Sequence, residues 1–133
     1  VRAVREFFMR QAVNTLIGNS DAHLKNFSVL YTDKVHPQLT PAYDIVCVAA
    51  LPGFSAYGMN VAVDRMQRAQ TLDTYTELAK AAGIAQRIAT AAVKAAVSAA
   101  QDTWPKMLDE LPTPKGMKEV ILDRLKTLPL ASL

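Results

Sequence analysis

Side chains that could hold a metal ion and move a proton are concentrated between residues 19 and 44. Asn26 follows Asp21 by five positions, and Asp44 follows Asn26 by 18 positions. Carboxylate and carboxamide oxygens are the ligands that Mg²⁺ prefers, and this ion takes only one or two carboxylates before water and substrate phosphates complete its shell. The remaining carboxylate is then free to act as a general base. These residue types and this spacing therefore predict a magnesium site beside a catalytic carboxylate.

A β-hairpin is predicted to bring these side chains together. Residues 27–31 and 35–40 are rich in aromatic and branched side chains and flank a short turn, which is typical of two paired strands. The second segment contains a proline, so we expect an edge or irregular strand in which His36 is exposed. An antiparallel hairpin returns the chain to its starting end, and we therefore expect Asp44 to lie near Asn26.

A helix is predicted to precede the polar segment and to end directly before it. In residues 1–17, apolar side chains recur on one helical face, and Gln11 lies off that face. The residues of this face are Val1, Val4, Phe8, Val13 and Leu16. Gly18 and Asn19 supply the stop, because both tolerate the left-handed conformation that commonly follows a last helical turn.

Helices are also predicted over most of the second half of the chain. Residues 71–74 offer N-cap side chains for a helix to residue 82, which Gly83 interrupts. The alanine-rich residues 79–100 are expected to form an internal packing helix, because alanine is a strong helix former with a small side chain. The other expected features are a short helix or buried strand at 45–51, a strand at 59–63, a tail punctuated by Pro105, Pro112 and Pro114, and a last helix at 115–125.

The composition excludes several classes of function. The chain has 133 residues, a net charge of +3, 50% hydrophobic residues and one cysteine, which fits a single globular domain in a reducing, cytoplasmic setting. Cys47 lies among apolar residues, so we expect a buried and unreactive thiol. The basic excess is spread out, which argues against direct nucleic-acid binding. The longest apolar run in the uncharged stretch, residues 45–51, is far shorter than the roughly 20 residues of a membrane-spanning helix, so we expect no membrane partner.

Each candidate side chain also has a purely structural interpretation. Asp21 and Asn26 could cap backbone groups in a helix-ending turn, as such residues often do. Asp44 could be the N-cap of a helix that begins directly after it, and this role is compatible with metal binding. His23 on its own fits a solvated or capping histidine, and Trp104 fits an anchor for packing.

Two motifs together resemble a known family. The string IGNSDAHLKNFS at residues 17–28, followed by LTPAYDI at residues 39–45, is similar to the C-terminal kinase region of HipA-type serine/threonine kinases, the toxin halves of bacterial toxin–antitoxin pairs. The resemblance is strong to about residue 64. It implies a mainly α fold with a small β-hairpin, a protein-kinase-like C-terminal lobe of the α+β class. The catalytic and metal loops would lie in residues 19–44 and a helical bundle at about residues 70–133.

The resemblance also assigns roles to individual side chains. Asp21 would be the catalytic base that orients the acceptor hydroxyl, and Lys25 would screen the charge of the transferring phosphoryl group. Asn26 and Asp44 would hold Mg²⁺. His23, together with Lys25, would face the nucleotide phosphates.

Two functions from different classes remain open. In the first, the chain transfers the γ-phosphate of ATP to a hydroxyl of a protein substrate, and Tyr43 lines the nucleotide pocket. The family's Gly-rich loop and nucleotide-lobe lysine have no counterpart before Val1, so the N-terminal ATP-binding lobe is expected to be absent and to be needed from the same or a separate chain. In the second, the chain is a catalytically silent helical module that docks an antitoxin or another protein.

Overall fold

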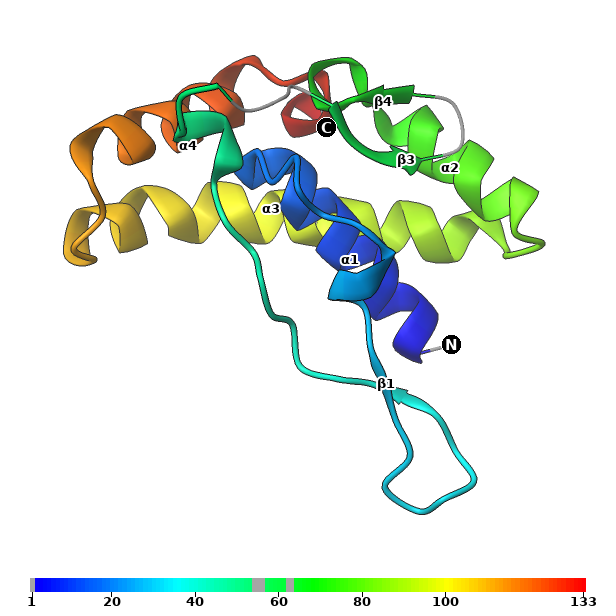
Figure 1. The fold of residues 1–133 in the computed structure, drawn as a ribbon. Coiled ribbons are helices and arrows are strands. Elements are labelled where there is room, and N and C mark those ends of the chain that lie inside the picture. Colours follow the sequence, from blue (N-terminus) through cyan, green and yellow to red (C-terminus); the bar gives the residue numbers. More distant parts are fainter. Residues whose placement is uncertain (1, 54–56, 62–63) are drawn as a thin grey trace.

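The protein is mainly helical and carries a small β-hairpin, as the sequence predicts, in a computed structural model that describes residues 2–53, 57–61 and 64–133 (Figure 1). The helices are α1 (Arg2–Ile17), α2 (Leu72–Ala81), α3 (Gln86–Glu110) and α4 (Lys115–Thr127). The antiparallel strand pairs are β1 (Val29–Leu30) with β2 (Gln38–Leu39), and β3 (Tyr57–Val61) with β4 (Asp64–Met66). The short 3-10 helices are η1 (Leu24–Asn26), η2 (Val48–Ala50), η3 (Gln67–Ala69) and η4 (Pro129–Ser132). Within the described ranges, no helix is long and apolar enough to cross a membrane.

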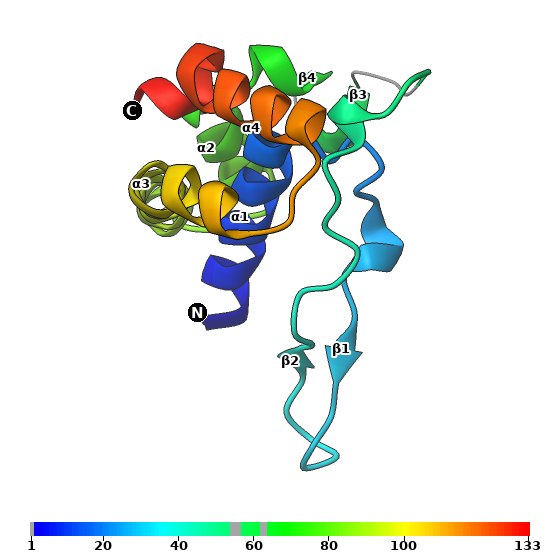
Figure 2. The same ribbon diagram turned by 90° about the vertical axis from the view of Figure 1, so that its left-hand side faces the viewer.

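Helix α1 packs across the long helix α3, and the contact between them forms the centre of the core (Figures 1 and 2). Phe8, Ala12 and Leu16 recur every four residues on α1 and are fully buried. The buried side chains of α3 are small: Ala89, Ala92, Val93, Ala96, Val97 and Ala100. Because the distance between packed helices depends on the side chains at their contact, these alanines allow close approach. Residues 86–100 of the alanine-rich segment therefore form a core helix, as predicted, whereas residues 79–81 belong to α2 and the chain between Ala81 and Gln86 is not helical.

Helix α1 is buried on more than its apolar face. The prediction that Gln11 lies off the buried face is therefore wrong. Gln11 is buried although the sequence pattern places it off the buried face. On the same helix, the Thr15 hydroxyl lies 2.6 Å from Gln70 Oε1 and 2.8 Å from the Tyr75 hydroxyl oxygen. Burial raises the pKa of Tyr75, so this hydroxyl stays protonated at neutral pH. Other parts of the chain thus enclose α1 on several sides, which the periodicity of α1 alone cannot reveal.

The β1–β2 hairpin projects from the helical body (Figures 1 and 2). Val29 pairs with Leu39 and Leu30 pairs with Gln38, so each strand has two residues and is shorter than predicted. Val29 and Leu30 are both exposed, which means that little packing stabilises a longer ladder. The hairpin nevertheless returns the chain to its starting end, as the sequence predicts.

His36 is exposed as predicted, but it lies in the turn of the hairpin and not in a strand. Its backbone N–H donates to Asp33 Oδ1 at 2.7 Å, and its ring Nδ1 lies 2.6 Å from Asp33 Oδ2. These bonds, with a further one from the Val35 N–H, lower the pKa of Asp33 to about 2. Local hydrogen bonding by an aspartate therefore takes up residues that the pattern assigned to a strand.

Other predicted elements are confirmed, shifted or wrong. Residues 45–51 contain the short helix η2 and no strand, and the buried Cys47 before it has a pKa raised by desolvation. The strand predicted at 59–63 is placed at Tyr57–Val61, while residues 62 and 63 lie outside the described residues.

The expectation that Pro105 interrupts the tail is wrong, because α3 continues through it to Glu110. Near an exposed helix end, water can solvate the carbonyl that a proline leaves unpaired. Trp104 packs against the core as expected.

Gly18 ends α1 in the left-handed conformation, with a φ of 82°, as the predicted stop requires. A Cβ atom here would lie 2.6 Å from the Ala49 Cβ and 2.9 Å from the Arg124 Nε. We expect Gly18→Ala to lower the free energy of unfolding by about 2–3 kcal/mol in urea denaturation, since overpacking adds to backbone strain. Gly83→Ala is the matched control, because Gly83 also has a positive φ but no neighbour within 4 Å. Its expected loss is about 1 kcal/mol, and equal losses in the two variants would contradict the importance of the close approach.

Candidate functional site

Asn26 and Asp44 are in direct contact, as the hairpin prediction requires. Asn26 Nδ2 donates to Asp44 Oδ2 at 2.6 Å, and Asn26 Oδ1 accepts the backbone N–H of His23 at 2.9 Å. The Asn26 side chain is buried, and the next residue, Phe27, packs on Phe7 of α1 with ring centroids 5.2 Å apart. Bonds at both ends of the carboxamide hold it in one orientation. Asn26 thus makes a local capping bond, as its structural interpretation requires, and also lies against Asp44, as the hairpin prediction requires.

The backbone of Asp44 is held in a left-handed conformation, with a φ of 57°. Aspartate is one of the few residues other than glycine that visit this region, at a cost of about 1–2 kcal/mol. The buried Asn19 stabilises it, since its Nδ2 donates both to the Asp44 carbonyl and to Asn14 Oδ1 at 3.0 Å. The interpretation of Asp44 as a helix cap is wrong, because η2 begins later and its N-cap is Cys47. Strained backbone of this kind is found preferentially at functional sites.

Two residues fix the chain on either side of the hairpin. Arg10 of α1 is buried, and its Nη2 donates to the Thr40 carbonyl at 2.5 Å and to Glu6 Oε1 at 2.7 Å. The Tyr43 hydroxyl donates to the Lys25 carbonyl at 2.7 Å and lies 2.6 Å from Ser28 Oγ. The segments directly before β1 and directly after β2 are thereby held in place near the Asn26–Asp44 contact.

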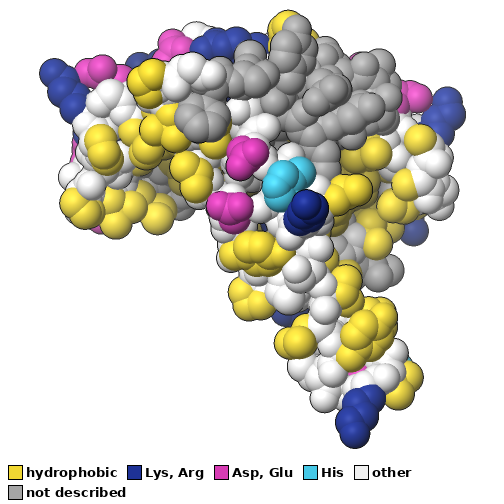
Figure 3. All heavy atoms as spheres, viewed as in Figure 1, with side chains coloured by type: hydrophobic (Ala, Val, Ile, Leu, Met, Phe, Trp, Pro, Cys, Tyr) yellow, Lys and Arg dark blue, Asp and Glu magenta, His cyan; other side chains and the backbone are white. Residues whose placement is uncertain are grey.

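The other predicted site residues lie on the surface. Asp21, His23 and Lys25 are all exposed, and His23 occupies the N-cap position of η1. In the part of the chain that the structure describes, the side chains of Asp21 and Lys25 form no hydrogen bond or ion pair with Asn26 or Asp44, whereas His23 and Asn26 form a capping box at the start of η1. On the face shown in Figure 3, acidic, histidine and basic side chains gather where the hairpin leaves the body. The structure therefore brings Asn26, Asp44 and Tyr43 together and leaves the proposed base open to solvent.

A buried polar network beneath the loop was missed by sequence reasoning. Gln67 Nε2 donates to the Asn19 carbonyl at 2.9 Å. Arg124 Nη2 donates to Gln67 Oε1 at 3.1 Å and to the Thr15 carbonyl at 2.6 Å, while its Nε donates to the Leu16 carbonyl at 3.2 Å. Arg124 thus caps the C-terminal end of α1, where cations are favourable. The two side chains come from η3 and α4, and no spacing within the motif segment signals them.

Removal of this arginine is expected to destabilise the fold. Arg124→Met leaves two backbone carbonyls and the Gln67 amide without their donor, and hydrogen bonds from charged groups contribute about 1.5–3 kcal/mol each. We expect the free energy of unfolding in urea to fall by about 3 kcal/mol or more. Arg68→Met is the control, since Arg68 is half-exposed and its ion pair with Asp123 is long, at 3.8 Å; its effect should stay within about 0.5–1 kcal/mol. A smaller loss in Arg124→Met than in Arg68→Met would contradict the capping role.

Comparison with known proteins points to one family. The family model "HipA-like C-terminal domain" matches residues 1–104. A Sinorhizobium fredii protein named "Putative kinase Y4dM" is 29% identical over 119 residues, covering 89% of this chain and 29% of that protein. A Haemophilus influenzae protein with the same kind of kinase name is 48% identical over 48 residues, which are 36% of this chain and 14% of that protein.

A solved structure shares the fold. It is the HipA, HipB and operator DNA complex of a Shewanella oneidensis toxin–antitoxin system, which matches with a TM-score of 0.69 and 19% identity over 98% of this chain and 31% of that chain. The chain therefore spans less than a third of the length of the Sinorhizobium and Shewanella proteins that it matches.

Proposed function

Because the chain belongs to the HipA-like C-terminal domain family, we propose that it is the C-terminal lobe of a serine/threonine protein kinase that transfers the γ-phosphate of ATP to a protein hydroxyl. The observation that carries this proposal is the contact between Asn26 and Asp44, with Asp44 held in a strained backbone conformation. In protein kinases an aspartate base, an asparagine and a second, metal-binding aspartate perform this chemistry. The chain spans less than a third of its kinase-named relative, so activity is proposed to need a nucleotide-binding lobe.

The oxygen atoms at the contact fit Mg²⁺. The hydrogen bond from Asn26 occupies Oδ2 of Asp44, and within the described residues no hydrogen bond reaches its Oδ1. Asn26 Oδ1 accepts one hydrogen bond and keeps a second lone pair. One carboxylate and one carboxamide, completed by water and nucleotide phosphates, match the ligand set that Mg²⁺ takes in phosphoryl-transfer enzymes. When bound, the ion would neutralise charge on the nucleotide phosphates.

The exposed Asp21 is proposed to accept the proton of the acceptor hydroxyl. Its position before η1 and its freedom from hydrogen bonds to Asn26 and Asp44 leave the carboxylate able to meet a protein substrate. Lys25 is exposed on the same loop and would screen the transferring phosphoryl group. His23 would face the nucleotide phosphates.

Tyr43 is proposed to act at the nucleotide site through its ring, because its hydroxyl already bonds to the Lys25 carbonyl. With Asn26 and Asp44 it lines a cavity of about 10 Å³, which is no larger than one water molecule. A nucleotide would therefore bind on the open side of these residues. The cytoplasm, where ATP is available, is the proposed setting.

An antitoxin is the proposed partner, since the matched HipA structure is a complex with HipB and operator DNA. In this proposal DNA contacts belong to the antitoxin. The basic residues of this chain are spread along the sequence and carry a net charge of only +3, whereas DNA binding usually needs a clustered patch.

The metal site can be tested with Mn²⁺, a paramagnetic substitute for Mg²⁺, by amide NMR of the chain. We expect Mn²⁺ to broaden the amide signals near Asn26 and Asp44 selectively, and Asp44→Ala to remove this broadening. Asp33→Asn is the matched control, because Asp33 is an exposed carboxylate in the hairpin turn and its loss should leave the broadening near Asn26 unchanged. Broadening that persists in Asp44→Ala, or none in the wild-type chain, would favour the silent binding module.

A further inference from the structure

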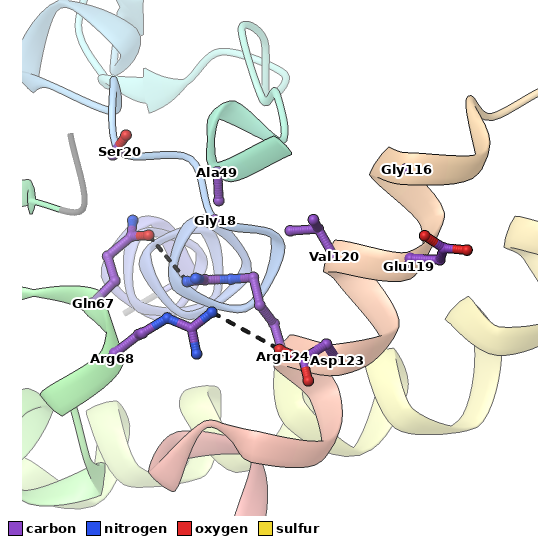
Figure 4. A pocket seen from close by; sticks show the side chains of 10 residues that line it. All are labelled: Gly18, Ser20, Ala49, Gln67, Arg68, Gly116, Glu119, Val120, Asp123 and Arg124. Atoms are coloured by element: carbon purple, nitrogen blue, oxygen red, sulfur yellow. Dashed lines mark hydrogen bonds and ion pairs between the residues drawn. The ribbon is translucent and has the colours of Figure 1, made fainter. Parts of the chain in front are cut away.

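A second pocket, of about 430 Å³, lies between the C-terminal end of α1, η3 and α4 (Figure 4). Its lining includes Gly18, Ser20, Gln67, Arg68, Val120 and Arg124, and it does not include Asn26 or Asp44. We propose that this pocket binds a small organic oxyanion, a carboxylate or a phosphate, through the guanidinium groups of Arg124 and Arg68. The inference goes beyond the proposed kinase activity and does not depend on it.

The first observation is that Arg124 is a charged residue and yet only 3% of its surface is exposed. Its Nε and Nη2 donate to two backbone carbonyls and to Gln67 Oε1, but its Nη1 has no partner among the described residues. Within these same residues, no carboxylate lies within ion-pair distance of the Arg124 side chain. Buried charges in proteins are normally paired with an opposite charge. The partial negative charge at the end of α1 compensates Arg124 only in part.

The second observation is that another cation faces the same space. Figure 4 shows the guanidinium groups of Arg68 and Arg124 next to each other at the pocket. Burial lowers the pKa of Arg124, and the neighbouring charge of Arg68 lowers it further. Two adjacent cations repel each other, and an oxyanion between them would offset that repulsion and accept hydrogen bonds from their N–H groups.

The acidic residues of the pocket pair with side chains other than Arg124. Asp123 pairs with Arg68 at 3.8 Å, and Glu119 pairs with Lys115 at 3.9 Å. Both are pairs between exposed side chains, which contribute little energy and can rearrange. Asp123 also favours the charged form of Arg124, although it lies beyond ion-pair distance, so the charge of Arg124 remains only partly compensated.

The size and remaining lining of the pocket favour an organic anion. A volume of about 430 Å³ lies within the range of small-molecule sites. Ala49 and Val120 supply apolar surface, and Ser20 brings a hydroxyl to the same pocket (Figure 4). The carboxylate or phosphate group would meet the guanidinium groups, and the organic part would lie on the apolar side chains.

The proposal is tested by amide and arginine Nε–H NMR of the chain, titrated separately with inorganic phosphate, sodium acetate and sodium chloride at matched ionic strength. We expect saturable shifts at Gly18, Ser20 and the Arg124 Nε–H with phosphate, with acetate or with both, and the anion that acts identifies the class. Shifts that are equal in chloride, or absent with both oxyanions, would overturn the proposal.

Variants separate the pocket from general anion effects. Arg68→Gln should fold normally and weaken binding about tenfold, as expected for the loss of one charge-assisted hydrogen bond. Lys94→Gln, at an exposed position on α3, is the control for net charge and should bind like the wild-type chain. Binding that is the same in Arg68→Gln as in Lys94→Gln would refute the assignment, whether or not the chain has kinase activity.

Discussion

Replacement of Asp44 with alanine is expected to lower the rate of phosphoryl transfer at least about 100-fold in a version of the protein that also carries a nucleotide-binding lobe. The substitution removes the carboxylate that accepts a hydrogen bond from Asn26, and the loss of one preorganised electrostatic group typically lowers kcat by about 10²–10³-fold. Loss of the metal ligand should also raise the KM for Mg–ATP. The measurement is the transfer of labelled γ-phosphate to a protein acceptor as a function of Mg–ATP concentration.

The control for this experiment is Asp33→Ala, which removes an exposed carboxylate from the hairpin turn and should leave activity unchanged. Asp44 is itself exposed, and among the described residues its side chain bonds only to Asn26, so we expect Asp44→Ala to lower the free energy of unfolding by only about 1 kcal/mol. Retained transfer in a folded Asp44→Ala protein would rule out the site assignment.

Replacement of Asp21 with asparagine is expected to lower kcat by about 10²–10⁴-fold, the usual contribution of a positioned general base. The fold should be unaffected, since Asp21 is exposed and no hydrogen bond of its side chain is seen within the described residues. In contrast to Asp44→Ala, this variant should keep both the KM for Mg–ATP and the Mn²⁺ broadening near Asn26. Single-turnover transfer in the lobe-complete protein measures the chemical step directly.

Ser20→Ala is the neighbouring control for Asp21, because it changes the same loop without removing a charge. We expect its kcat to stay close to that of the wild-type protein. If Asp21→Asn and Ser20→Ala slow transfer equally, the effect comes from the loop conformation, and Asp21 is not the base.

Much of the site follows from local sequence. The stop at Gly18 could be predicted because few residues adopt a positive φ, and the structure places Gly18 at φ 82°. The proximity of Asn26 and Asp44 also follows from sequence, since a hairpin of any length brings its two ends together. It holds here although the strands have two residues each and His36 lies in the turn.

The predictions for Gln11 and Pro105 failed for different physical reasons. Gln11 is off the apolar face of α1, yet it is buried because other segments enclose that helix. Pro105 disfavours a helix locally, yet α3 passes through it. Packing of distant segments decides the burial of Gln11, whereas Pro105 is exposed and lies where water can solvate the carbonyl that it leaves unpaired.

The sequence by itself determined the family, the mainly helical class and the pair of residues that meet at the base of the hairpin. Only the tertiary structure decided how that pair is held. The left-handed conformation of Asp44 depends on Asn19, which bonds through its own carbonyl to Gln67, which in turn bonds to Arg124. Arg124 is 108 positions from the Leu16 carbonyl that it caps. Contacts between such distant residues depend on how the helices pack, and no periodicity or motif spacing records that packing.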